Sequence, residues 1–186
     1  MKKAFPIGLV IVGLAFMVGG IYTLVQGFTA KAAVRDQIVG QNIVTPEDAT
    51  IPNVLVQDAD TAHSMGLIIG EHALEATGGK TYSEMGRFLT PDGGDTSDEA
   101  EALKDESGNP VANPARNVAF QASALQSMLH STHLAFEVSD LVIGLGAMIV
   151  VLGIAVAGIG VALGALAIPT LAKRFQVEPV AVRPAA

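Results

Sequence analysis

Two long apolar runs lie near the ends of the 186-residue chain, and a mostly polar stretch separates them. The first run, 4–30, and the second run, 141–172, contain no charged residue. Because a helix rises about 1.5 Å per residue, about 20 apolar residues cross the roughly 30 Å hydrocarbon core of a bilayer. The pattern therefore predicts an all-α membrane protein with transmembrane helices at 5–27 and 141–170.

The first apolar run also has features of a cleaved signal peptide. Lys2 and Lys3 form a basic start, and Ala30-Lys31-Ala32 fits the small-residue pattern of a cleavage site. The apolar stretch is, however, much longer than the roughly 7–15 residues of a usual signal-peptide core. We therefore expect a retained membrane anchor.

The polar stretch carries the signals of a small helical headpiece. Two prolines predict an extended connector at 36–57. A helix is expected at 59–77, where apolar residues recur with helical spacing until the Gly78-Gly79 pair. The S/T-x-x-E sequence at 81–84 is a capping box, which predicts a second, short helix.

An acidic, glycine-containing stretch at 91–112 precedes the longest predicted helix. Its composition predicts a solvated loop with at most one helical turn. Asn113-Pro114 then has the form of an N-cap followed by proline at the first helical position, and no helix breaker follows before Pro169. We expect one continuous helix of about 55 residues, which contains the second transmembrane segment and projects from the membrane to pack on the 59–77 helix.

The basic residues next to the apolar runs predict the orientation in the membrane. Five lie on one side and two on the other: Lys2, Lys3, Lys173, Arg174 and Arg183 against Lys31 and Arg35. The excess of Lys and Arg marks the cytoplasmic side. We therefore expect a bacterial plasma-membrane protein with cytoplasmic ends at 1–4 and 171–186, and with 28–140 extracytoplasmic. This middle segment holds 6 basic and 17 acidic residues, a balance that excludes a nucleic-acid binder.

Small residues recur along both apolar runs. On the second run they are Gly146, Gly153, Ala157, Gly160 and Gly164, with Val150 among them. On the first run they are Gly8, Ala15 and Gly19, with Val12 among them. Small side chains let helix backbones approach closely in lipid, where the hydrophobic effect does not drive association. Although glycine is frequent in membrane helices generally, the spacing favours packing faces, either between the two helices or towards a partner subunit.

Two stretches carry a family resemblance: HALEATGGKTYSEM at 72–85 and ARNVAFQASALQSMLHSTHLAFEVSDLVIGLG at 115–146. They resemble small actinobacterial membrane proteins that have two transmembrane helices and a TxGKTYxEM-type core. Proteins of this group often carry the name of a ring-opening dioxygenase small subunit, although this sequence has no facial-triad site. The resemblance implies a bacterial plasma-membrane protein that is an added subunit of a larger complex, and it brings no catalytic residues.

Few residues offer chemistry. His130, His133 and Glu137 share one face of the long helix, and His72 on the 59–77 helix is expected to approach them. Imidazole with carboxylate suits Zn or Cu, so this set is a candidate metal site. The alternative is a polar network between helices or towards a partner. The chain has no Cys and no GxSxG sequence, and Gly78-Gly79-Lys80-Thr81 lacks the first glycine of a phosphate-binding loop.

These observations favour a non-enzymatic protein without a resident cofactor or a small-molecule substrate. The leading hypothesis is an accessory subunit of a larger integral-membrane complex, with a respiratory or other redox complex as the expected host. Its expected partners are other membrane subunits and the lipid bilayer. Two alternatives stay open: an extracytoplasmic transition-metal-binding protein and a homo-oligomeric envelope scaffold.

Overall fold

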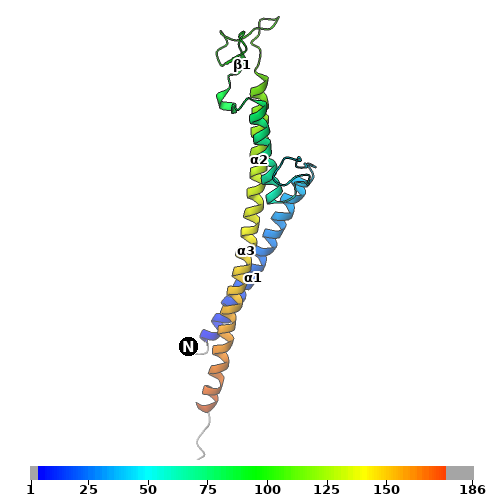
Figure 1. The fold of residues 1–186 in the computed structure, drawn as a ribbon. Coiled ribbons are helices and arrows are strands. Elements are labelled where there is room, and N and C mark those ends of the chain that lie inside the picture. Colours follow the sequence, from blue (N-terminus) through cyan, green and yellow to red (C-terminus); the bar gives the residue numbers. More distant parts are fainter. Residues whose placement is uncertain (1–3, 175–186) are drawn as a thin grey trace, which may run out of the picture. The chain divides into compact units, whose positions relative to one another are not determined.

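The structure is a computed structural model that describes residues 4–174, with side chains described as far as residue 166. The expected cytoplasmic ends at 1–4 and 171–186 fall almost entirely outside these residues. The described elements are α1 (Ala4–Val39), α2 (Ala59–Ala76), a 3₁₀ turn η1 (Tyr82–Glu84), β1 (Phe88–Leu89), β2 (Asp95–Thr96) and α3 (Pro114–Arg174) (Figure 1).

Two of the helices, α1 over Ala4–Val39 and α3 over Pro114–Leu166, are long and apolar enough to cross a membrane. The expectation of two membrane-length apolar helices is therefore confirmed. The first helix is longer than the predicted 5–27 segment, because residues 28–39 contain neither proline nor glycine and continue the helix as far as Gly40. The second is a single helix from Pro114, as the sequence predicted.

Local caps position α2 and α3. At the start of α2, the Thr61 N–H donates to Asp58 Oδ1 over 2.9 Å, and at its end the Gly79 N–H donates to the Leu74 carbonyl over 2.7 Å. Asn113 caps α3, because its Oδ1 accepts from the Ala115 N–H over 3.1 Å. Side-chain oxygens at an N-cap satisfy the first N–H groups, which have no partner within the helix. These ends agree with the sequence-based predictions.

The described chain divides into two compact units. Unit 1 contains the residues up to Thr29 and those from Asp140 onward, so it consists of the most apolar parts of α1 and α3. Unit 2 is Ala30–Ser139 and contains the end of α1, all of α2, the first part of α3 and the segments between them.

Unit 2 has an apolar core to which three helices contribute. Ile38 of α1, Ala62 of α2, and Leu129 and Phe136 of α3 surround Val56 of the connector. Val56 and Phe136 are almost fully buried, at 0% and 1% exposure. Burial of such side chains is the main stabilising contribution in a water-exposed domain.

The predicted extended connector is instead a folded loop. Thr45 is buried, its N–H donates to the Val54 carbonyl over 2.9 Å, and the Val54 N–H donates to Thr45 Oγ1 over 3.1 Å. Val44 and Leu55 form an antiparallel bridge beside this pair. Pro46 and Pro52 exclude a helix, as expected, but backbone pairing across the loop closes it and delivers Val56 to the core.

The headpiece is also not entirely helical, because the acidic stretch 91–112 takes part in β-type pairing. β1 pairs antiparallel with β2. The Leu89 N–H donates to Val111 O, Leu103 N–H to Leu89 O, and Val111 N–H to Leu103 O, over 2.7–3.0 Å. Leu89, Leu103 and Val111 are apolar positions among the acids, and glycine turns with positive φ at Gly93 and Gly108 bring their backbones together. Most of the stretch is the irregular loop that the sequence predicted, and the pairing at these few positions was not expected.

Candidate functional site

A row of glycines forms the contact between α1 and α3 in unit 1. A Cβ built on Gly13 would lie 2.5 Å from Ala157 N and 2.6 Å from Gly153 O. One on Gly20 would lie 2.7 Å from Val150 N and 2.9 Å from Gly146 O. Real Cβ atoms do not come so close to backbone atoms, so the two backbones touch where any side chain would separate them.

The same contact continues toward both ends of unit 1. Gly27 meets Ile143, where a Cβ would lie 3.0 Å from the backbone nitrogen, and Gly160 meets Pro6 and Val10. As the α1 residue number rises, the α3 residue number falls, so the helices are antiparallel. We call this contact the glycine seam and define it by Gly13, Gly20 and Gly27 of α1 and Gly146, Gly153 and Gly160 of α3.

Glycines of the seam recur every seven residues on each helix. A seven-residue repeat corresponds to 3.5 residues per turn, the period of helices that wind around each other with a left-handed crossing. The row that the sequence analysis named on α1 differs: a Cβ on Gly8 or Gly19 would meet nothing within 4 Å, and Ala15 is exposed. Both rows contain small residues, and only the position of α3 decides which of them is used.

The α3 residues named from the sequence lie mainly at the glycine seam. Gly146, Gly153 and Gly160 belong to it, and Ala157 faces Gly13. Gly164 lies at its margin, where a Cβ would be 3.8 Å from Pro6 Cβ.

A second glycine contact, which the sequence analysis missed, joins α2 to α3 in unit 2. Gly66 and Gly70 of α2 lie against the side chains of His130 and Gln126 of α3. A Cβ on Gly66 would lie 2.8 Å from His130 Cδ2, and one on Gly70 would lie 2.5 Å from Gln126 Nε2. The G-x-x-x-G spacing of Gly66 and Gly70 was the sequence signal for this contact.

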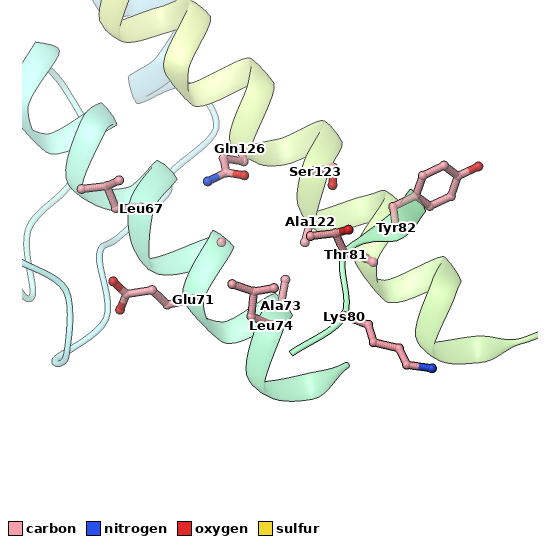
Figure 2. Close-up of a pocket in the computed structure, with 12 residues that line it drawn as sticks. Leu67, Glu71, Ala73, Leu74, Lys80, Thr81, Tyr82, Ala122, Ser123 and Gln126 are labelled. Atoms are coloured by element: carbon pink, nitrogen blue, oxygen red, sulfur yellow. The ribbon is translucent and has the colours of Figure 1, made fainter. Parts of the chain in front are cut away.

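A cavity of about 310 Å³ lies between the end of α2, the η1 turn and α3 (Figure 2). Its apolar lining includes Leu67 and Leu74 of α2 and Ala122 of α3. Figure 2 shows Gln126, Ser123 and Tyr82 around the same space. Glu71, Lys80 and Ser123 also line the cavity.

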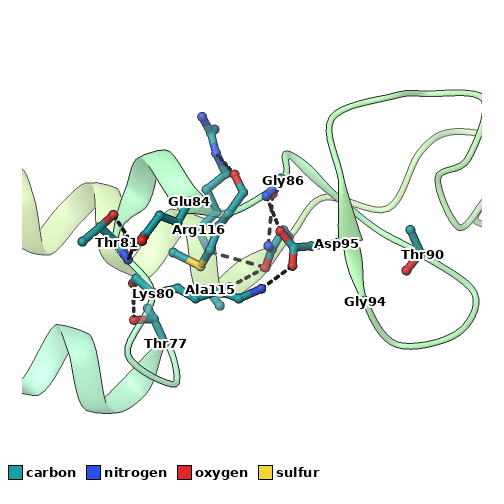
Figure 3. A network of polar contacts seen from close by, with 12 residues as sticks. Thr77, Lys80, Thr81, Glu84, Gly86, Thr90, Gly94, Asp95, Ala115 and Arg116 are labelled. Atoms are coloured by element: carbon teal, nitrogen blue, oxygen red, sulfur yellow. Dashed lines mark hydrogen bonds and ion pairs between the residues drawn. The ribbon is translucent and has the colours of Figure 1, made fainter.

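The TGGKTYSEM sequence forms a polar network against the start of α3 (Figure 3). The Arg116 guanidinium lies 3.9 Å from the Tyr82 ring centre, and its Nε donates to the Met85 carbonyl over 3.1 Å. Asn113 Nδ2 donates to the Gly86 carbonyl over 3.1 Å. These contacts assign the motif a structural role, in which it anchors the loop between α2 and β1 to the first turn of α3.

Two carboxylates complete this network. Glu84 accepts from the Thr81 N–H over 2.8 Å, and Asp95 accepts from Lys80 Nζ over 2.8 Å and from the Gly86 N–H. The hydrogen bond from Thr81 lowers the pKa of Glu84, and the bond from Lys80 lowers the pKa of Asp95. Both carboxylates are therefore held ionised, which suits an anchor and does not suit a proton donor at neutral pH.

The structure does not bring together the four candidate metal ligands named from the sequence. His72 Nε2 lies 2.7 Å from Asp48 Oδ2, and this pairing ties α2 to the connector. The carboxylate raises the pKa of His72, and the imidazole lowers that of Asp48. His130 and His133 instead lie beside His63, whose ring centre is 4.9 Å from that of His133.

The sequence-based set named His72 of α2 and missed His63 on the same helix. In the described part of the chain, no group of three or more His, Asp or Glu side chains is arranged to hold a metal ion. Glu137 is exposed on α3.

No family model, curated protein or solved structure matches this chain. The resemblance to small actinobacterial two-helix membrane proteins therefore stays a prediction.

An exposed apolar surface lies on α3 in unit 2. Phe120, Met128, Leu134 and Val138 of this helix are apolar and 56–66% exposed. We call these four residues the outer face of α3. Residues 117–136 contain no charged side chain, although the rest of unit 2 is strongly acidic. A groove of about 590 Å³ between the end of α1 and α3 is lined by Met128, Val34 and Ile38, among others.

Proposed function

We propose that the chain is a non-catalytic accessory subunit of a larger integral-membrane complex. The outer face of α3 carries this proposal. A water-exposed helix that needs no partner usually presents charged residues on its outer side, as α2 does with Glu71 and Glu75. α3 presents Phe120 and Met128 instead, and exposed apolar surfaces of this kind mark interaction sites.

The glycine seam supports the same proposal from the membrane side. Because α1 and α3 contact each other through glycines, their large side chains point away from the seam: Ile11, Val18 and Val151 are 62–69% exposed. Gly8, Gly19, Gly144 and Gly158 lie off the seam, where an added Cβ would meet nothing within 4 Å. Close approach of a further helix at such positions is the usual mode of association in lipid.

Purification in a mild detergent tests the proposal. The wild-type chain is expected to purify with other integral-membrane chains at fixed stoichiometry. Met128→Glu places a charge on the outer face of α3 and is expected to release those partners, because an unpaired carboxylate would be desolvated in the contact. Met128 is 66% exposed, so the variant should fold normally.

Val44→Glu is the matched control. Val44 is also an exposed apolar residue of unit 2, at 53% exposure, but it lies on the connector. This variant should keep the partners. Recovery of the wild-type chain alone after gentle crosslinking would contradict the proposal, and a native mass equal to several copies of this chain would support the scaffold alternative.

The orientation is part of the proposal, with both ends cytoplasmic and unit 2 extracytoplasmic. The chain has no cysteine, so a single introduced cysteine is a clean probe. Ala100→Cys, at an exposed position of the acidic stretch, should react with a membrane-impermeant maleimide in intact cells. Arg183→Cys should react only after the membrane is permeabilised. The reverse pattern would overturn the orientation.

A further inference from the structure

Three histidines from two helices lie together in unit 2. The ring centre of His63 on α2 is 4.9 Å from that of His133 and 5.8 Å from that of His130, both on α3. We call these residues the histidine cluster. When two imidazoles bind one ion at about 2 Å from each nitrogen, their ring centres lie about 5 Å apart. The spacing of His63 and His133 is close to this value, and that of His63 and His130 is somewhat longer.

One ring nitrogen of His133 is held by the backbone of α2. Its Nδ1 lies 3.0 Å from the carbonyl oxygen of Ala59. A carbonyl oxygen can only accept, so Nδ1 carries the proton and Nε2 keeps its lone pair. Histidines that bind metals commonly donate their other N–H to a backbone carbonyl, which fixes the tautomer in this way.

His130 has an unsatisfied ring nitrogen. Its Nε2 is buried and has no hydrogen-bond partner among the described residues. The ring lies against Gly66, where a Cβ would be 2.9 Å from this nitrogen. A buried polar atom without a partner is unfavourable, and sites where ions bind are one explanation for such atoms. Rotation of the ring about its Cβ–Cγ bond turns Nε2 away from Gly66.

We infer that the histidine cluster binds one divalent transition-metal ion of the class that prefers imidazole, namely Zn²⁺, Ni²⁺ or Cu²⁺. The donor nitrogens do not converge on one point in the structure, so binding requires rotation of the His63 and His130 rings. His63 is exposed and can turn in solvent. The bound ion would join α2 to α3, and this inference is independent of the outer face of α3.

Metal titration of the full-length chain in detergent tests the inference. The protein is purified without a histidine tag, stripped with a chelator and titrated with Zn²⁺, Ni²⁺ or Mg²⁺, with binding followed by calorimetry and metal analysis. One Zn²⁺ or Ni²⁺ per chain is expected, and no Mg²⁺. Affinity should fall in acidic solution, because protons compete with the metal for the ring nitrogens.

Two histidine variants decide the assignment. His63→Ala is expected to weaken Zn²⁺ binding at least about tenfold, since changes outside the ligand shell alone cost about 10- to 100-fold. His72→Ala is the matched control, because it removes a histidine of the same helix that is paired with Asp48. His72→Ala should bind as the wild type does.

The inference is overturned by a wild type that binds no Zn²⁺ or Ni²⁺, or by equal losses in the two variants. It is also overturned if His63→Ala binds with unchanged affinity. Circular dichroism of each variant, recorded before titration, separates a lost ligand from a lost fold; because His63 is exposed, its replacement should leave the helical signal unchanged.

Discussion

α1 and α3 contact each other in both units, but they do so by opposite means. In unit 2 the contact contains large apolar side chains, with Ile38 from α1 and Phe136 from α3 in the core. In unit 1 the contact is the glycine seam, where backbone meets backbone, and the large side chains are exposed. The same pair of helices thus changes its packing mode along its length.

The difference is the one expected if unit 1 lies in lipid and unit 2 in water, as proposed above. In water, an apolar side chain gains free energy by leaving the solvent, so large residues belong inside the contact. In lipid that gain disappears, and helices associate through close packing, which glycine permits best. In both units, large apolar side chains therefore lie where their surroundings favour them. Val18 and Val151 are exposed in unit 1, whereas Phe136 is buried in unit 2.

The largest expected effect is on the core of unit 2. Phe136→Ala should destabilise this unit by about 3–5 kcal/mol, because a fully buried ring is replaced by a cavity. Chemical denaturation followed by circular dichroism measures the loss. Val138→Ala, two residues away and 56% exposed, should cost less than about 0.5 kcal/mol. Equal losses would show that unit 2 has no side-chain core.

The next effect is on the glycine seam. Gly13→Ala adds only a methyl group, but it would meet the α3 backbone, so we expect a loss of about 1–3 kcal/mol and a lower melting temperature in detergent. Gly8→Ala is the control on the same helix. Its methyl group would meet nothing within 4 Å, and alanine favours the helix. If both variants melt alike, the helices do not approach each other at Gly13.

A smaller effect is expected where the TGGKTYSEM sequence meets α3. Asn113→Ala removes the N-cap and the hydrogen bond to Gly86, at a cost of about 0.5–2 kcal/mol. Faster hydrogen exchange at the amides of residues 115–117 would report it. Asn117→Ala, at an exposed position one turn later, should leave those amides protected. Unchanged exchange rates in Asn113→Ala would show that the Asn113 side chain does not stabilise the start of α3.

The smallest effect is the pH dependence of the His72–Asp48 pair. The raised pKa of His72 means that its contribution is complete below 6.5 and is lost as the pH rises through the raised value. The lowered pKa of Asp48 means that its contribution is present above 3.8 and is lost as the pH falls through the lowered value. The connector is therefore held most firmly between these two ordinary values.

Titration of His72 by NMR checks this pair. In Asp48→Asn the titration midpoint of His72 should fall towards the ordinary value, because the neutral amide stabilises the imidazolium less than a carboxylate does. Glu47→Gln, which removes a neighbouring charge that does not bond to His72, is the control. If both variants change the His72 midpoint equally, the pKa of His72 is set by the total nearby charge and not by its hydrogen bond to Asp48.

The sequence predicted those features that depend only on residues close together in the chain, namely helix caps and long apolar segments. The charge-free runs predicted two membrane-length helices, and Asn113-Pro114 predicted the start of α3. Each of these signals acts within one or two helical turns. Helix caps and the length of an apolar run can therefore be predicted without knowledge of the fold.

Features that depend on distant residues were predicted poorly. The pairing of Thr45 with Val54, and that of Leu89 with Leu103 and Val111, joins residues that no local pattern connects. The candidate metal set included His72 because its helix was expected near α3. In the structure His72 is instead paired with Asp48 of the connector. The choice between two glycine rows on α1 likewise depends on where α3 lies.

The seven-residue repeat makes the glycine seam nearly identical to itself after a translation. A shift of α1 by one repeat, about 10.5 Å along its axis, would place Gly13 opposite Gly146 or Gly160 in place of Gly153. The glycines alone therefore do not select one alignment of the membrane helices. Residues beside the seam on α3 must make that selection: Val150 meets Gly20 and Ala157 meets Gly13, and their different sizes distinguish the alternative alignments.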